Sequence, residues 1–255
     1  MMDQRLAGRV AIVTGGGKGI GAHYVQGLAR AGARVAAADI DLTAARAAAD
    51  RLGAQELDVL GLEVDVSRAE SVERMVAQVV DRFGRLDILV NNAALYAALM
   101  PKRHFFELTP EDWDRVLAVN VKGLFLCAKA AFPHLKASGH GRIINISSGT
   151  AYSGNTGFLH YVTSKAAVIG FTRSLARELG EYDITVNAIA PGLTASETAV
   201  AAYPPGEIEA RAQSRAIKRV QVPDDLVGTV TFLSSDAAAF MTGQTLVVDG
   251  GNVMS

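Results

Sequence analysis

The sequence has 255 residues, which is enough for one large α/β domain or at most two small domains. Hydrophobic residues make up 49% and charged residues 20%, a balance typical of a folded globular protein rather than a disordered one. The formal net charge of −1 leaves no overall field that would attract nucleic acid or an anionic membrane surface.

Cysteines, histidines and apolar runs exclude several further classes of protein. Cys127 is the single cysteine, so neither an intramolecular disulfide nor a cysteine-rich zinc site can form. The five histidines show no metal-ligand spacing, and we expect no metal. Residues 1–9 are charged and lack a long apolar core, and no run approaches the ~20 apolar residues that cross a bilayer. The sequence predicts a soluble, cytoplasmic protein with no membrane partner.

Short apolar runs alternate with longer segments of helical period along the chain. We expect strands at 10–14, 34–39, 60–66, 86–91, 142–147, 184–189 and 245–249, and helices at 19–31, 43–52, 68–83, 110–135, 157–179 and 223–234. The strands are apolar on successive residues, as in a sheet covered on both faces. The alternation predicts an α/β fold: a single-domain, Rossmann-like, doubly wound parallel sheet of about seven strands with helices on both faces. The domain spans 1–255, with a substrate lid around 193–219.

Several helix ends carry recognisable residue types. Thr109 is a capping residue followed by proline and two acids, which predicts a helix that begins at Pro110. Glycine follows four other helical stretches, where a left-handed cap favours it: Gly32, Gly53, Gly84 and Gly180.

A glycine-rich turn, residues 15–21, joins the first strand to the first helix. It reads Gly-Gly-Gly-Lys-Gly-Ile-Gly. Glycine lets the backbone approach a pyrophosphate there, and the following helix offers its N–H groups. A turn that only permits tight packing is the alternative, but the position after the first strand favours phosphate binding.

Two charged residues near this turn bear on the choice between NAD and NADP. Asp39 ends the second strand, where a carboxylate can bind the adenosine ribose hydroxyls and would repel a 2′-phosphate. Lys18 can pair with that phosphate, or it can be a solvated surface lysine. Because Asp39 is expected at the ribose itself, we predict NAD rather than NADP as the cofactor.

Tyr161 and Lys165 stand at i and i+4 of a helical stretch and therefore share one helix face. A phenol with a pKa near ~10 is a poor base at neutral pH, and a nearby ammonium favours the phenolate. Such pairs also occur on ordinary amphipathic helices. Here, however, the preceding strand ends in Ser147 and Ser148, at the sheet edge where ligands bind. One serine can donate to an oxygen that gains charge during the reaction, while the other caps the turn.

These residues, taken with others in the same order, resemble the short-chain dehydrogenase/reductase family over nearly the whole chain. The matching elements are Thr14-Gly15-x-x-x-Gly19-x-Gly21, Asp65, Asn91-Asn92-Ala93-Ala94, Asn120, Ser148, Tyr161-x-x-x-Lys165, Pro191-Gly192 and Asp249-Gly250-Gly251. Ala94 replaces a more usual glycine and Ser196 a commoner threonine. Both departures affect fine geometry rather than activity.

The resemblance implies a role for each matching residue. Tyr161 would act as general base and acid, and Lys165 would lower its pKa. Ser148 would orient the substrate, and Asn120 would hold a water that links Lys165 to solvent. The implied cofactor contacts are Gly15, Lys18, Gly19, Ile20, Asp39, Asp65, Val66, Asn92, Tyr161, Lys165, Pro191, Gly192, Thr194 and Ser196.

The resemblance further implies an NAD-dependent dehydrogenase of secondary alcohols that forms a homotetramer, with a dimer as the alternative. Aromatic residues such as Tyr96 and Tyr203 suit a bulky, uncharged or aromatic substrate, unless they only pack the lid. Basic residues between 211 and 219 can meet an anion, but such charges usually face solvent. The competing functions are an NADPH-dependent carbonyl or 3-oxoacyl-carrier-protein reductase, against which Asp39 argues, and a non-catalytic cofactor sensor.

Overall fold

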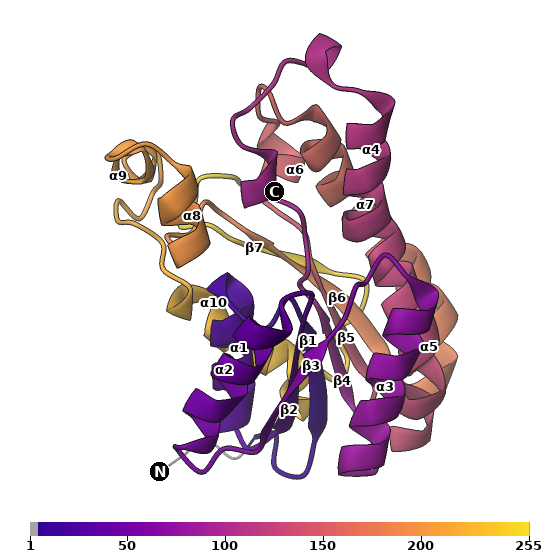
Figure 1. Cartoon of the computed structure of the whole chain (residues 1–255). Helices are drawn as coiled ribbons and strands as arrows, with labels where there is room; N and C mark the ends of the chain where they lie inside the picture. The colour runs from indigo at the N-terminus through magenta and orange to yellow at the C-terminus, as the bar shows by residue number, and fades with distance from the viewer. Residues whose placement is uncertain (1–4, 255) are drawn as a thin grey trace.

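A computed structural model describes residues 5–254 and contains one parallel sheet (Figure 1). Within these residues the sheet has seven strands in the order β3-β2-β1-β4-β5-β6-β7. Their bounds are β1 Val10–Thr14, β2 Arg34–Asp39, β3 Val59–Glu63, β4 Ile88–Asn91, β5 Arg142–Ile146, β6 Thr185–Pro191 and β7 Thr245–Val248. The order reverses between β1 and β4, as in a doubly wound sheet. The predicted fold class is therefore confirmed.

Helices cover both faces of the sheet (Figure 1). One face carries α1, α2 and α10, and the other carries α3, α5 and α7. The longer helices are α1 Gly19–Arg30, α2 Leu42–Gly53, α3 Ala69–Phe83, α4 Pro110–Leu117, α5 Gly123–Ser138, α7 Leu159–Leu179 and α10 Asp224–Ser234. The shorter ones are α6 Thr150–Ser153, α8 Glu197–Ala202 and α9 Glu207–Ala212.

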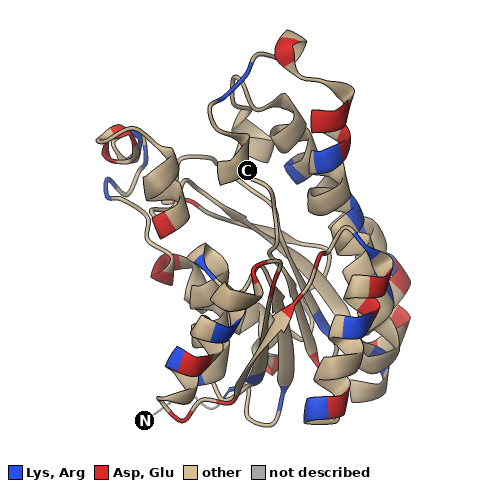
Figure 2. Cartoon of the chain, viewed as in Figure 1, with Lys and Arg blue, Asp and Glu red and all other residues tan. Residues whose placement is uncertain are grey.

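Successive strand residues enter opposite halves of the core, which explains the continuous apolar runs. Val10 and Ile12 pack with α3 and α5, whereas Ala11 and Val13 pack with α1 and α10. All four are fully buried. Figure 2 shows that Lys, Arg, Asp and Glu lie mainly on the helices and connecting segments that surround the sheet.

The predicted third strand ends too late. It was expected to reach Val66, but β3 ends at Glu63. The next residues leave the sheet and line the cavity described below. The other strands agree with their expected bounds to within one or two residues.

The helix predicted at 110–135 is interrupted. α4 ends at Leu117, a π-helical segment spans Ala118–Lys122, and α5 continues to Ser138. The whole stretch Pro110–Ser138 is long and apolar enough to cross a membrane by length and composition, so the expectation that no run approaches this length is corrected. In the fold, Cys127, Ala131 and Leu135 of this stretch lie in the core, and core helices of soluble proteins pass the same test.

The left-handed glycine caps are confirmed at two of the four expected places. Gly32 and Gly84 have φ values of 97° and 79°. Gly53 instead remains inside α2, and Gly180 has a φ of −61°. After these two helices, Glu56 and Asp183 adopt the left-handed conformation, which non-glycine residues adopt less readily. The capping box at Thr109 is present, with its hydroxyl accepting from Asp112 N–H at 3.2 Å.

Candidate active site

A cavity of about 690 Å³ opens beyond the carboxyl ends of the central strands. It extends from the glycine turn after β1, past the end of β5, to the lid helices α8 and α9. With the exception of Asn120, every residue proposed for catalysis or cofactor binding lines it: Gly15, Lys18, Gly19, Ile20, Asp39, Asp65, Val66, Asn92, Ser148, Tyr161, Lys165, Pro191, Gly192, Thr194 and Ser196. Parallel strands end at one edge of a sheet, so residues far apart in sequence meet there.

The glycine turn follows the sheet closely and has no room for side chains. A Cβ on Gly15 would lie 3.0 Å from the Cα of Ala93, and one on Gly21 would overlap the carbonyl oxygen of Gly15. Gly15 and Gly19 have φ values of 63° and 59°, in the region that favours glycine. Asn92 holds the turn by donating from its side-chain nitrogen to the carbonyls of Thr14 and Gly15, each at 3.0 Å. Such a turn at a helix N-terminus fits the pyrophosphate of a dinucleotide.

A lid carboxylate already binds this helix N-terminus. The N–H of Gly19 donates to Oε1 of Glu197 at 2.6 Å. Glu197 is the first residue of α8. Although burial favours its protonated form, the bond from Gly19 holds the pKa of Glu197 below its ordinary value. This contact confirms that the first turn of α1 attracts an anion.

Asp39 lies buried at the end of β2 and is tied to the glycine turn. Its carboxylate accepts from Gly17 N–H at 3.0 Å and from Asp41 N–H at 3.1 Å. The ammonium of Lys18 lies 3.6 Å from the carboxylate of Asp41. The lysine that was considered for a 2′-phosphate therefore already has an acidic partner at this end of the cavity.

Tyr161 and Lys165 lie one turn apart on α7, both buried. The ammonium of Lys165 is 5.8 Å from the centre of the Tyr161 ring and donates to the Ile146 carbonyl at 2.7 Å. Burial lowers the pKa of Lys165 to about 8. Burial raises the pKa of Tyr161, against the opposing effect of a hydrogen bond with Ser148. The group that lowers the pKa of Tyr161 here is Ser148, and a lowering of this pKa by Lys165 stays a prediction.

The two serines after β5 have different partners. Ser147 donates to the carbonyl of Lys165 at 2.7 Å and thereby joins the strand to α7. Ser148 accepts from the N–H and the hydroxyl of Thr150, at 3.3 and 3.0 Å. Because Ser148 also interacts with the Tyr161 hydroxyl, it is the serine next to the phenol.

Asn120 lies in the π-helical segment, fully buried and behind the cavity wall. Its side chain accepts from Leu95 N–H at 2.8 Å and donates to Ser164 Oγ at 3.0 Å. It thus connects the interrupted helix to the loop after β4 and to α7. The i→i+5 segment turns this amide inward, an arrangement common at functional sites.

An aromatic wall beside Tyr161 contains residues that sequence reasoning identified only in part. The Tyr96 ring centre lies 5.2 Å from that of Tyr161, and its hydroxyl is 2.6 Å from the hydroxyl of Tyr203. Phe158 lies 5.6 Å from Tyr161 and was not identified. It directly precedes α7, and its position three residues before Tyr161 was the available signal.

Comparisons with known proteins agree with this geometry. Residues 15–252 match a family described as enoyl-(acyl carrier protein) reductase. The chain is 40% identical over 243 residues to the (2S)-[(R)-hydroxy(phenyl)methyl]succinyl-CoA dehydrogenase subunit BbsD of Thauera aromatica, covering 95% of this chain and 96% of that one. It is 40% identical over 249 residues to the probable galactose dehydrogenase GalD of Rhizobium meliloti, covering 96% and 95%. It is 36% identical over 254 residues to the 3-oxoacyl-[acyl-carrier-protein] reductase of Synechocystis, covering 98% of each chain.

Proposed function

Because the chain belongs to the short-chain dehydrogenase/reductase family, we propose that it transfers a hydride between NAD(H) and the carbon of a secondary alcohol or ketone. The observation that carries this proposal is the convergence of Ser148, Tyr161 and Lys165 in the cavity that also contains the glycine turn and Asp39. Bound nicotinamide would accept the hydride in oxidation and return it in reduction.

The side chains around Tyr161 would manage the proton. We assign to Tyr161 the transfer of the alcohol proton, taken up as the carbon loses its hydride and returned in the reverse direction. Ser148 would hold the substrate oxygen by a hydrogen bond that strengthens as the oxygen gains charge. The ammonium of Lys165 would stabilise the phenolate, and Asn120 would position the helix and the proton path behind it.

The cofactor proposed is NAD. The support is the buried carboxylate of Asp39 at the end of β2, together with the ion pair that engages Lys18. A 2′-phosphate beside two carboxylates, those of Asp39 and Asp41, would meet like charge. The relative from Synechocystis favours a second candidate, a 3-oxoacyl-carrier-protein reductase that uses NADPH. The cofactor assay described below separates the two.

The substrate proposed has a bulky apolar or aromatic group next to the reacting carbon. Tyr96, Phe158 and Tyr203 supply the surface for it, within 7 Å of one another or of Tyr161 by ring centres. Aromatic groups pack well against such rings in offset or tilted arrangements.

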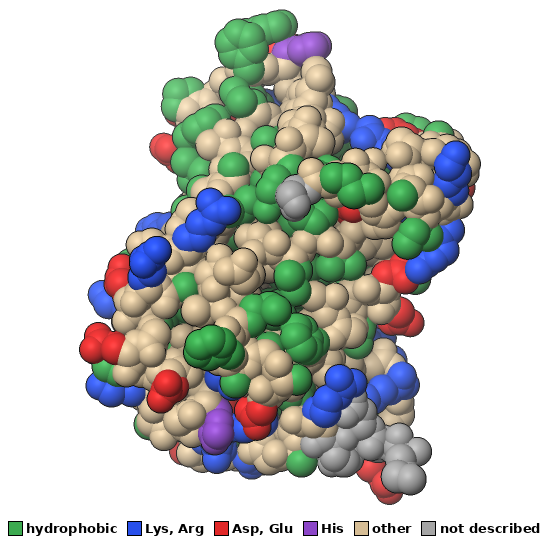
Figure 3. Space-filling view, turned by 180° about the vertical axis from the view of Figure 1, so that it is seen from behind, with side chains coloured by type: hydrophobic (Ala, Val, Ile, Leu, Met, Phe, Trp, Pro, Cys, Tyr) green, Lys and Arg blue, Asp and Glu red, His purple; other side chains and the backbone are tan. Residues whose placement is uncertain are grey.

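We also propose that the enzyme works as a cytoplasmic homotetramer. Hydrophobic side chains gather on the face shown in Figure 3 and on its upper projection. Among exposed hydrophobic residues, Phe125 on α5 and Leu159 on α7 are about half exposed. Contacts between copies of the chain would bury such exposed apolar side chains. Light scattering on the eluting peak of a sizing column is expected to give four times the mass of one chain, and two times supports the dimer instead.

Formation of reduced nicotinamide tests the main proposal. We would offer NAD and NADP with a panel of aromatic, alicyclic, steroid and sugar alcohols. Turnover with NAD on aromatic alcohols is the expected outcome. Silence across the alcohols, together with oxidation of NADPH by oxoacyl thioesters in the reverse direction, supports the second candidate. Tyr161→Phe should lower kcat by at least about 10²-fold and leave NAD binding intact. Tyr182→Phe, the same change on η4 (Gly180–Tyr182), is the control.

A further inference from the structure

Two cations lie against the rings of the aromatic wall: Arg211, which lines the cavity, and Lys102, which lies beside the cavity lining. The ammonium of Lys102 is 5.4 Å from the Phe158 ring centre and 5.9 Å from that of Tyr203. The guanidinium of Arg211, on α9, lies 5.5 Å from the Tyr203 ring centre and lines the cavity. Since Tyr203 contacts Tyr96, which contacts Tyr161, the rings form a continuous wall from the proposed proton donor to the two cations.

Each of these cations keeps hydrogen-bond donors without a protein partner. Nε and Nη2 of Arg211 both donate to Oε1 of Glu207, at 3.0 and 2.7 Å. Its remaining nitrogen, Nη1, and the whole ammonium of Lys102 have no hydrogen-bonding or ionic partner within residues 5–254. Acidic and basic residues lie next to one another at α9 (Figure 2).

The charges beside this wall do not balance. Burial lowers the pKa of Lys102, and the neighbouring positive charge of Arg211 lowers it further, while Glu207 opposes them. A third cation, Arg215, is 4% exposed and donates to the carbonyls of Leu193 and Arg219, so it holds the lid backbone. Its charge is offset by Asp249. Arg211 and Lys102 share one carboxylate, that of Glu207, so one positive charge is in excess among these three residues.

We infer that the substrate carries a carboxylate, held by Lys102 and Arg211 at the lid end of the cavity while its apolar part lies along Tyr96, Phe158 and Tyr203. This inference rests on the proposed function and names its substrate class more narrowly. It replaces the expectation of an uncharged substrate. A guanidinium and an ammonium that share an anion form charge-assisted hydrogen bonds, and these gain strength beside low-dielectric aromatic walls.

Two matched alcohols test the inference in turnover with NAD. One is 4-(1-hydroxyethyl)benzoate, and the other is the neutral 4-(1-hydroxyethyl)benzamide of nearly the same shape. The expected kcat/KM is about ten- to hundredfold higher for the benzoate, mostly through KM, because charge-assisted bonds are lost in the amide. Arg211→Gln and Lys102→Gln should each reduce this preference about tenfold, through a higher KM for the benzoate.

The chain offers matched controls outside the cavity. Arg82 pairs with Asp58 at 3.1 Å and lies 4.8 Å from the Phe83 ring centre, so Arg82→Gln removes the same kinds of contact as Arg211→Gln. Lys136 lies 4.2 Å from the Tyr182 ring centre, so Lys136→Gln is the matching control for Lys102→Gln. Neither control variant should change the preference. An equal loss of preference in Arg82→Gln and Arg211→Gln would overturn the inference.

A binding measurement separates failure of the inference from failure of the proposed function. Calorimetry with the NADH-bound enzyme compares 4-isopropylbenzoate with 4-isopropylbenzamide, neither of which can be oxidised at a carbinol carbon. Tighter binding of the benzoate that is lost in Arg211→Gln supports the carboxylate site. If the alcohols are then not turned over, that result rejects only the proposed function. Equal binding of both, or no binding of either, rejects the carboxylate site whatever the enzyme oxidises.

Discussion

Lys165 and Tyr161 lie side by side in α7, and burial acts on their ionisation in opposite senses. It lowers the pKa of the ammonium to about 8 and raises that of the phenol. Both effects disfavour the charged pair, the ammonium with the phenolate, that acid–base chemistry requires. A positive charge next to the phenol, such as that of an oxidised nicotinamide, shifts the balance back towards the phenolate.

The lowered pKa of Lys165 predicts how stability changes with pH. Between about pH 8 and 10.5, the unfolded chain binds a proton at this residue that the native chain has lost. The contribution of this residue to the free energy of unfolding therefore increases as pH rises through that window, by up to about 1.4 kcal/mol per pH unit. Between pH 8 and 10, the free energy of unfolding of the wild type should rise relative to that of Lys165→Met. The difference between the wild type and Lys129→Met should stay constant. Urea unfolding at pH 8, 9 and 10 measures both. Parallel profiles for wild type and Lys165→Met would contradict the assigned pKa.

Removal of the charge of Asp39 should change which cofactor the enzyme prefers. Asp39→Asn removes the negative charge and keeps an acceptor for only one of the two N–H groups, those of Gly17 and Asp41, that the two carboxylate oxygens bind. We expect the ratio of kcat/KM with NADP to that with NAD to rise at least about tenfold, since like-charge contacts cost several kcal/mol. Asp58→Asn, a similar loss of charge away from the cavity, should leave the ratio unchanged. No change in Asp39→Asn would mean that Asp39 does not face the ribose.

At the scale of elements, the lid and the glycine turn share one contact. Ser196 precedes α8 and caps it by accepting a hydrogen bond from Ala199 N–H. Glu197, the first residue of α8, reaches the N-terminus of α1. The lid is also joined to the segment before α10 by a parallel bridge between Thr194 and Gln221. The segment that contains α8 therefore contacts the turn that is proposed to bind the cofactor.

Glu197 predicts that the lid competes with the cofactor for the first turn of α1. Its carboxylate uses the Gly19 N–H that a pyrophosphate would bind, and it repels that anion. Glu197→Gln should lower the Kd for NADH about two- to fivefold, the range expected for one charge at a helix end. Fluorescence titration measures this, with Glu209→Gln on α9 as a control for charge alone. An unchanged Kd for NADH would show that breaking the contact between Glu197 and Gly19 does not weaken cofactor binding.

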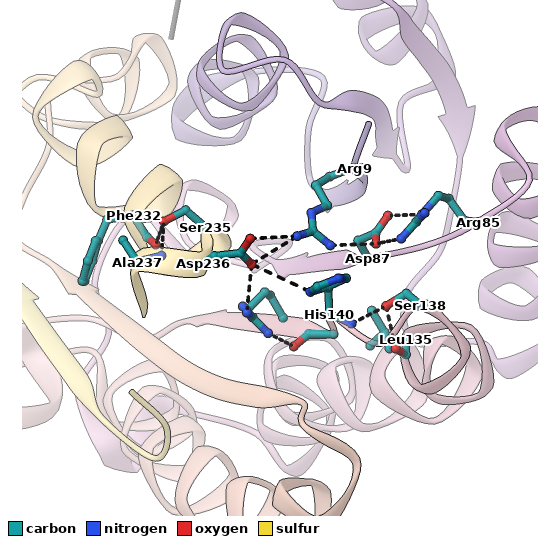
Figure 4. A network of polar contacts seen from close by, with 12 residues as sticks. Arg9, Arg85, Asp87, Leu135, Ser138, His140, Phe232, Ser235, Asp236 and Ala237 are labelled. Atoms are coloured by element: carbon teal, nitrogen blue, oxygen red, sulfur yellow. Dashed lines mark hydrogen bonds and ion pairs between the residues drawn. The ribbon is translucent and has the colours of Figure 1, made fainter. Parts of the chain in front are cut away.

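At the scale of the whole molecule, a polar network joins β1, β4 and β5 at the edge opposite the cavity (Figure 4). Asp87 is fully buried and accepts from Arg85 Nε and Val10 N–H, each at 2.9 Å. Arg9 lies between Asp87 and Asp236, at 3.7 and 3.0 Å. The network satisfies charged groups where the strands begin, and it leaves the other edge free for ligands.

Asp87→Ala should destabilise the protein without touching its chemistry. The change leaves Val10 N–H without its acceptor and removes a buried charge from between two arginines. We expect a loss of about 2–3 kcal/mol in the free energy of unfolding, measured with urea. Asp58→Ala removes the partly exposed pair with Arg82 and should cost less than about 1 kcal/mol. Similar losses in both variants would show that the Asp87 network is no stronger than a surface ion pair.

The sequence by itself determined the sheet and most of the cavity lining. Apolar runs covered on both faces, such as 10–14 and 34–39, have few other ways to bury their side chains, and a glycine turn after the first strand has a narrow set of geometries. Such signals depend on residues that are close together in the chain, and they can therefore be recognised in one sequence.

Only the tertiary structure decided features that depend on packing between distant segments. The π-helical segment around Asn120 exists because that amide bonds to Leu95 and Ser164. The left-handed residues after α2 and α7 are Glu56 and Asp183 rather than the predicted glycines Gly53 and Gly180. Lys102 lies in the loop after β4 and Arg211 on α9, and the folding of both against the Tyr203 ring makes them a pair. Charges read singly from a sequence look solvated, whereas their burial and their partners are properties of the fold.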